Sequence, residues 1–159
     1  MLCQPLMCLT VDVKEIKETY PPRVYFTIGT IIMNDDEVEV YVVNTFSAKA
    51  RKEAVSDEHL LEAAKEIVSG LVDANLSGSL VKKRIASGLR NTGRSDGDRA
   101  IVSIKRGRKL FYLYLFSKKE KDNITKKELK ALKDYGELMF SYTDEQLNKM
   151  VSSGVLRKL

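Results

Sequence analysis

Basic side chains gather in one part of this sequence, and their chemistry stands out first. Residues 82–121 contain thirteen Lys or Arg against three Asp or Glu, a net charge of +10, whereas the whole 159-residue chain has a net charge of +5. This excess is typical of a surface that binds a polyanion, of which RNA and DNA are the commonest. The basic residues fall into four groups: Lys82-Lys83-Arg84, then Arg90, Arg94 and Arg99, then residues 105–109, and then residues 118–121.

These residue types indicate what chemistry the region can perform. Arg stays protonated, so it can bind a phosphate and stabilise the charge that develops there. Lys can act as a general acid or base where neighbouring cations disfavour its charged form. In RNA the adjacent 2′-hydroxyl can be the nucleophile, so the protein needs mainly to position the strand and neutralise the phosphate. The pattern therefore favours metal-free chemistry on a phosphodiester.

Several other site types are excluded or disfavoured. A single histidine, His59, excludes a nuclease built on two imidazoles. The carboxylates of the basic region form no metal-binding pattern, which disfavours metal-dependent phosphodiester cleavage. The glycines of residues 93–97 lack the spacing and the following Lys-Ser/Thr of a P-loop. We expect no metal and no cofactor.

Cysteine usage and hydropathy indicate the setting. Cys3 and Cys8 are the only cysteines, too few for a disulfide framework or a four-ligand zinc site, and they favour a reducing, cytoplasmic location. No apolar run approaches the ~20 residues that span a bilayer, so we expect no membrane association.

The elements that must position the basic residues can be read from periodicity and capping signals. Alternating or continuous apolar residues predict strands at Val38–Val43, Leu80–Ile85, Arg99–Ile104 and Leu110–Phe116, the last two forming a hairpin around Gly107. Helices are predicted at Phe46–Val55, after an N-cap at Ser56, and after capping boxes at Thr125 and Thr143, and a turn is predicted over Leu76–Ser79.

This order predicts an α+β fold, a small twisted and mainly antiparallel sheet with helices packed on one face. We assign residues 33–159 to this domain and residues 1–32 to an N-terminal extension of unknown role, with a turn-like acidic boundary over 33–36. On a strand, Lys82 and Arg84 point one way and Lys83 the other. If the strands from 80, 99 and 110 are neighbours, Lys82 and Arg84 converge with Arg99 and the lysines after the last strand.

Several blocks together resemble the RelE/HigB-like type II toxins of the RelE/ParE superfamily. Residues 81–85 (VKKRI) are similar to a basic strand of this family, and residues 93–99 (GRSDGDR) are similar to its glycine-rich block that ends in Arg. Residues 111–124 (FYLYLFSKKEKDNI) are similar to the family's next strand and the basic turn after it. Residues 46–55, 125–135 and 142–156 resemble the family's first helix, next helix and closing segment. The likeness covers residues 38–159 in order.

The resemblance implies a compact α+β domain that cleaves mRNA in the ribosomal A site without metal and is neutralised by a cognate antitoxin, often a helix-turn-helix protein. It implies that Arg99 contacts the scissile phosphate and that Lys118, Lys119, Lys82 and Arg84 complete the catalytic group. Further RNA contacts are expected from one tyrosine and the remaining basic side chains: Lys83, Arg90, Arg94, Lys105, Arg106, Arg108 and Tyr114.

Two alternatives remain open at this point. One is a non-catalytic relative that binds RNA or the ribosome, which Asp96 and Asp98 favour because an acid beside the phosphate-binding Arg weakens anion binding. The other is a ParE-like inhibitor of DNA gyrase, for which a basic strand surface is less natural.

Overall fold

The chain divides into two units, Met1–Asp35 and Asp36–Leu159. The computed structural model describes residues 26–27, 30–31, 38–86, 97–105 and 109–159. In the first unit it describes two short antiparallel strands, β1 (Phe26–Thr27) and β2 (Thr30–Ile31). The predicted boundary over residues 33–36 lies outside the described residues.

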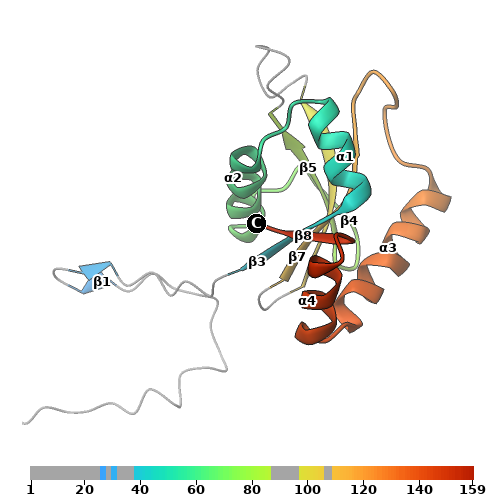
Figure 1. The fold of residues 1–159 in the computed structure, drawn as a ribbon. Coiled ribbons are helices and arrows are strands. Elements are labelled where there is room, and N and C mark those ends of the chain that lie inside the picture. The colour runs from blue at the N-terminus through green and yellow to red at the C-terminus, as the bar shows by residue number, and fades with distance from the viewer. Residues whose placement is uncertain (1–25, 28–29, 32–37, 87–96, 106–108) are drawn as a thin grey trace, which may run out of the picture. The chain divides into compact units, whose positions relative to one another are not determined.

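The second unit is built on a six-stranded mixed sheet (Figure 1). Its strand order is β4-β5-β6-β7-β3-β8, and only the central neighbours β3 and β7 run parallel among the pairs described. The predicted α+β class with a mainly antiparallel sheet is confirmed. The strands are β3 (Glu39–Val43), β4 (Ala74–Ser77), β5 (Leu80–Ile85), β6 (Asp98–Lys105), β7 (Lys109–Phe116) and β8 (Leu156–Lys158).

The two outer strands were not predicted. β4 occupies part of the segment predicted as a turn over Leu76–Ser79, so that prediction is wrong for its first two residues. β8 lies in the closing segment of the chain, beside β3. Both strands are short, and pairing stabilises their extended backbone. β4 pairs with β5, which follows it in a hairpin, and β8 pairs with β3, which is distant in sequence. The hairpin of β6 and β7 is confirmed by the pairing of Lys105 with Lys109, and its tip lies outside the described residues.

Helix starts follow the predicted caps. Ser56, Thr125 and Thr143 are all N-caps whose side chains accept a hydrogen bond from the backbone N–H three residues on, and each forms a capping box. The helix predicted at Phe46–Val55 begins and ends earlier, with no side-chain cap at Val43. The helices are α1 (Asn44–Lys52), α2 (Asp57–Val68), α3 (Lys126–Ser141) and α4 (Asp144–Ser152).

Helices cover both faces of the sheet, which corrects the prediction that they pack on one face. The hydroxyl of Tyr112 donates to the carbonyl of Leu60 in α2 at 2.6 Å, and its ring lies 5.2 Å from Phe46 of α1. The neighbouring Phe111 instead contacts Phe140 of α3, with ring centroids 5.2 Å apart. Successive residues of a strand point to opposite faces, so α1 and α2 lie on one face and α3 on the other.

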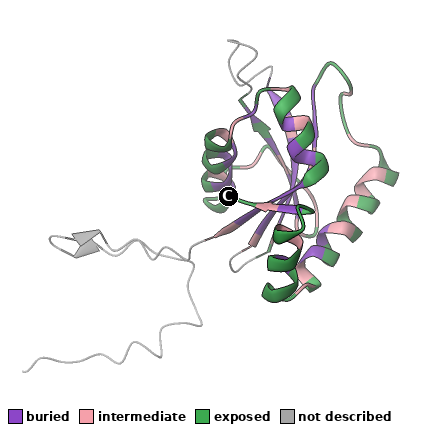
Figure 2. Cartoon of the chain, in the orientation of Figure 1, coloured by how far each residue is buried: buried purple, intermediate pink, exposed green. Residues whose placement is uncertain are grey.

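The sequence contained the signal for this arrangement. Residues 110–116 are apolar or aromatic without interruption, and a strand of that kind is buried on both faces. In the structure Leu110, Phe111 and Tyr112 are each 0% exposed, and the buried residues follow the central strands (Figure 2). The prediction of a single covered face had rested on the order of the predicted elements.

Gly136 lets α3 approach the sheet closely. A Cβ atom at this position would lie 2.5 Å from the Oγ of Ser103 in β6 and 3.6 Å from a methyl carbon of Leu113 in β7. α3 therefore covers the end of the sheet where β6 finishes and β7 begins. The opposite end of these strands carries Arg99 in β6 and, just after β7, Lys118 and Lys119.

Candidate nucleic-acid interface

A row of three side chains crosses β5, β6 and β7 near the end of the sheet. Arg84 is the Cα partner of Arg99, and Arg99 is the Cα partner of Phe116. Directly opposed residues of antiparallel strands project on the same side of the sheet. Two arginines and an aromatic ring therefore share one face, as the sequence predicted for the arginines.

A second row runs parallel to the first, two residues along each strand. It consists of Lys82, Ile101 and Tyr114. Residues two apart on a strand share a face, so both rows lie on the same side. We call this surface the basic face, and it comprises Lys82, Arg84, Arg99, Tyr114 and Phe116.

A β-bulge in β7 decides where Tyr114 points. Val102 pairs with Tyr112 but Ile101 pairs with Tyr114, so Leu113 is an extra residue in β7. Without this bulge, alternation would place Tyr114 beside Tyr112, under α1 and α2. The bulge turns Tyr114 and Phe116 to the side of Arg99, and bulges are frequent where a side chain must be re-aimed near a site.

Arg99 carries an unused hydrogen-bond donor. Its Nη1 atom is buried and has no hydrogen-bond partner in the part of the chain that the structure describes. A buried donor without a partner costs free energy. Because this atom is inaccessible to solvent, a phosphate oxygen would reach it only after the side chain moved. Asp98 is 1% exposed and, by strand alternation, points to the other face.

The other two cations of the basic face differ in how they are held. Arg84 has a 47% exposed side chain, and its Nε lies 3.5 Å from the carboxylate of Asp73, which also accepts a 2.6 Å hydrogen bond from the Arg84 backbone. Asp73 thus orients Arg84 at the edge of the face. Lys82 is half-buried between the strands on either side.

Lys83, predicted to bind RNA, lies on the opposite face. Its ammonium donates to the carbonyl of Leu71 at 2.6 Å and forms an ion pair with Glu66 of α2 at 2.6 Å. The residue is 8% exposed. Lys83 therefore ties α2 to the sheet and does not contribute to the basic face.

Lys118 and Lys119 are exposed in the turn that follows β7. The carbonyl of Ser117 shapes this turn by accepting from the backbone N–H groups of Glu120 and Lys121 at 3.1 and 3.2 Å. Because Phe116 is the partner of Arg99, the turn lies at the same end of the sheet as Arg99.

The remaining predicted residues lie elsewhere. Lys105 is six residues from Arg99 along β6, which at ~3.3 Å per residue is about 20 Å. It lies 3.7 Å from the carboxylate of Glu137 and 5.5 Å from the ring centre of Phe140. Arg90, Arg94, Arg106 and Arg108 lie outside the described residues.

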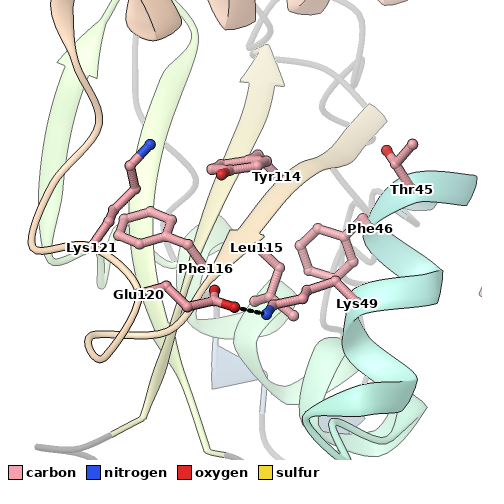
Figure 3. A pocket seen from close by; sticks show the side chains of 8 residues that line it. All are labelled: Thr45, Phe46, Lys49, Tyr114, Leu115, Phe116, Glu120 and Lys121. Atoms are coloured by element: carbon pink, nitrogen blue, oxygen red, sulfur yellow. Dashed lines mark hydrogen bonds and ion pairs between the residues drawn. The ribbon is translucent and has the colours of Figure 1, made fainter.

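A half-open cavity of ≈ 490 Å³ adjoins the basic face (Figure 3). We call it the α1–β7 pocket. Of its lining residues, the sequence predicted only Tyr114 as an RNA contact, although Glu120 and Lys121 belong to the fourth basic group. No local pattern shows that α1 runs beside the end of β7. The lining residues are Thr45, Phe46, Lys49, Tyr114, Leu115, Phe116, Glu120 and Lys121.

Three ion pairs involve residues that line this pocket. Lys49 of α1 lies 3.0 Å from the carboxylate of Glu53 and donates to that of Glu120, and the hydrogen bond to Glu120 lowers the pKa of Glu120 and raises the pKa of Lys49. Lys121 lies 5.7 Å from the ring centre of Tyr114 and pairs with Glu128. The hydrogen bond from Lys121 is the main reason why the pKa of Glu128 falls to about 2.

The described residues contain no group of three or more His, Cys, Asp or Glu placed to hold a metal ion. None of their helices has the length and apolar composition to cross a membrane.

The fold and the basic face together define a small α+β protein with a surface suited to phosphate groups, beside a pocket with aromatic walls. The family described as the RelE toxin of the RelE/RelB toxin-antitoxin system matches residues 38–159. The chain therefore belongs to this toxin family, and the family implies a cognate antitoxin as its partner. No curated protein matches the chain in sequence.

Proposed function

We propose that this toxin is a metal-independent endoribonuclease that cleaves mRNA on the ribosome and so inhibits translation. The basic face is the catalytic surface, with Arg99, Lys82, Arg84, Lys118 and Lys119 as the residues that contact the reacting strand. The observation that carries the proposal is the pair of cross-strand rows, which brings three cations and two aromatic rings to one face.

The place of Arg99 in the middle of the first row, between Arg84 and Phe116, supports its role as the main phosphate ligand. In the reaction we propose, the 2′-oxygen attacks phosphorus, the bond to the 5′-oxygen breaks, and a 2′,3′-cyclic phosphate forms. The 2′-hydroxyl loses its proton to a base, and the departing 5′-oxygen gains one. In this proposal Arg99 and Arg84 stabilise the additional negative charge, and Lys82 exchanges protons with the oxygens at phosphorus.

The position of Asp98 bears on the non-catalytic alternative. Asp98 points away from the basic face and is buried, so it does not repel a phosphate at Arg99 at contact distance. Asp96 lies outside the described residues. We retain RNA or ribosome binding without cleavage, and gyrase inhibition, as outcomes that the experiment must separate.

The remaining expectations complete the proposal. We propose that the toxin acts in the cytoplasm, and that its antitoxin is of the helix-turn-helix type. Both expectations rest on the sequence and on the family resemblance. A short helix-turn-helix reading frame beside the gene would support the proposed antitoxin.

The test compares wild-type and Arg99→Ala chains in cells and on purified ribosomes. We expect wild-type protein to arrest growth and to cut ribosome-bound mRNA at defined codon positions, mapped by primer extension. Arg99→Ala should cut about 100-fold more slowly, the effect of removing one charge-stabilising donor. Lys105→Ala is the matched control, since it removes a cation from the far end of the same strand and should cut at the wild-type rate.

Each other outcome rejects the proposal in a different way. Salt-sensitive RNA binding by the wild type without cleavage would identify a non-catalytic binding protein. A DNA-damage response without mRNA cleavage would point to gyrase. Equal loss of cleavage in Arg99→Ala and Lys105→Ala, with both proteins folded by circular dichroism, would move the active site away from the basic face.

A further inference from the structure

The α1–β7 pocket forms because β3 is shorter than β7. β3 pairs with β7 up to Val42 and Tyr112, and after Val43 the chain turns into α1. From Leu113 onward, the neighbour of β7 on this side is therefore a helix. Figure 3 shows α1 with Phe46 and Lys49 on one side of the hollow and Tyr114 and Phe116 on the other.

The walls of the pocket suit a flat aromatic ligand. Tyr114 is only half-buried, and its ring is stacked on Phe116, with centroids 5.8 Å apart and planes 27° apart. Phe46, Leu115 and Phe116 also line the pocket but are only 1%, 3% and 1% exposed, so Tyr114 is the ring that a ligand can stack on. Aromatic side chains of this kind stack on nucleobases at about 1–3 kcal/mol per base.

The rim of the pocket supplies both a donor and an acceptor. Lys49 and Glu120 form an ion pair there, and Glu120 is 52% exposed. The hydrogen bond from Lys49 lowers the pKa of Glu120, so the carboxylate stays ionised and accepts hydrogen bonds at neutral pH. The Watson–Crick edge of each nucleobase carries an acceptor next to an N–H donor, and this pair can meet both together.

The pocket lies one nucleotide from the phosphate site. Phe116, which lines the pocket, is the Cα partner of Arg99, and adjacent strands lie ~4.8 Å apart. Tyr114 is two residues from Phe116 on β7, so their Cα atoms are about 6.6 Å apart. An RNA strand with a phosphate at Arg99 can therefore place the neighbouring base against Tyr114.

We propose that the α1–β7 pocket binds a nucleobase next to the phosphate held by Arg99, with Tyr114 as the stacking surface and Lys49 and Glu120 contacting the base edge. This inference rests on the proposed function for its substrate. It makes α1 a specificity element of the toxin.

The first test measures binding without cleavage. The four ribonucleoside 3′-monophosphates are titrated into the full chain, and amide shifts are followed by NMR, with inorganic phosphate as a separate probe. We expect a nucleotide to shift Tyr114, Lys49 and Glu120 as well as Arg99, and inorganic phosphate to shift Arg99 without the pocket. Nucleotides that shift only Arg99 at millimolar concentration would overturn the proposal.

The second test uses variants. Tyr114→Leu removes the ring but keeps an apolar side chain, and it should weaken nucleotide binding about 5-fold to 100-fold, from the stacking energy above. Glu120→Gln should change the rank order of the four nucleotides. Lys52→Ala, a change on the exposed part of α1, is the matched control and should bind all four as the wild type does. Unchanged affinity and rank order in both pocket variants would overturn the proposal.

The two proposals fail separately. If nucleotides occupy the pocket but the wild type cuts no ribosome-bound mRNA, the endoribonuclease proposal fails and the nucleobase pocket stands. If the wild type cuts mRNA but Tyr114→Leu and Glu120→Gln keep its cleavage-site preference, the pocket proposal fails and the catalytic face stands.

Discussion

Lys82 and Lys83 are adjacent in the chain, but their side chains lie on opposite faces of the sheet and have different roles. Lys83 is 8% exposed and pairs with Glu66 and the carbonyl of Leu71, so it stabilises the packing of α2. Lys82 lies on the basic face in the row that ends at Tyr114. The comparison teaches that a run of basic residues on a strand divides between the two faces of the sheet. Side chains on one face stabilise the packing, and side chains on the other can contact a ligand.

The same division applies to Asp98 and Arg99 in β6. Asp98 is buried on the face of α1 and α2, whereas Arg99 keeps an unused donor on the basic face. Variants of the exposed or half-buried cations of the basic face should therefore change activity and leave stability intact, and variants of the buried Lys83 and Asp98 should do the reverse.

The largest difference in cleavage rate and in free energy of unfolding is expected between Lys82→Met and Lys83→Met. Lys82→Met should slow mRNA cleavage about 10-fold or more, because a group positioned for proton transfer or charge stabilisation is lost, with an unchanged free energy of unfolding. Primer extension and urea unfolding measure the two quantities. A Lys82→Met protein that is less stable than the wild type but cuts mRNA at the wild-type rate would contradict the proposed role of Lys82.

Lys83→Met should lower the free energy of unfolding by about 2 kcal/mol, because the ion pair with Glu66 and the hydrogen bond to the carbonyl of Leu71 are both lost. Its cleavage rate per folded molecule should equal that of the wild type. A stable Lys83→Met protein with impaired RNA binding would instead return Lys83 to the binding surface.

Gly136→Ala probes the contact of α3 with the sheet. The new Cβ would meet the Oγ of Ser103 at 2.5 Å, and overpacking of this kind costs about 1–3 kcal/mol, offset by about 1 kcal/mol of helix propensity. We expect a net loss of about 1 kcal/mol in thermal or urea unfolding. The double variant with Ser103→Ala should recover part of that loss, and no recovery would show that the close contact is not the cause.

Tyr112→Phe tests the packing of α2 with a smaller change. It removes the hydroxyl that donates to the carbonyl of Leu60 at 2.6 Å and leaves the ring in place. A net loss of about 1 kcal/mol in the free energy of unfolding is expected for one buried hydrogen bond. Cleavage should be unaffected, and a cleavage defect in a folded Tyr112→Phe protein would extend the site through the sheet.

The smallest effect is expected from Glu128, near the α1–β7 pocket. Its pKa is lowered from 4.5 to about 2, first by the hydrogen bond from Lys121 and then by those from Thr125. A lowered folded-state pKa gives stability that is present above pH 4.5 and is lost as the pH falls toward 2. The stability difference between wild type and Glu128→Gln should therefore shrink from pH 6 to pH 2 in urea unfolding, and a constant difference would contradict the pairing.

Much of the fold was accessible from local sequence because local forces decide it. Ser56, Thr125 and Thr143 fix helix starts through hydrogen bonds within three residues, and alternation or continuity of apolar residues marks the central strands. The edge strands β4 and β8 were missed because four and three residues carry little pattern, and pairing alone makes them strands.

For the site, the sequence by itself determined that positive charge is concentrated in residues 82–121 and that Lys82 and Arg84 share a face opposite to Lys83. It determined this because strand alternation is a property of the backbone. Only the tertiary structure decided that Tyr114 joins Arg99, since the bulge at Leu113 is set by the pairing of β7 with β6. It also brought Lys49 of α1 to Glu120, because packing between segments 71 residues apart leaves no mark in local sequence.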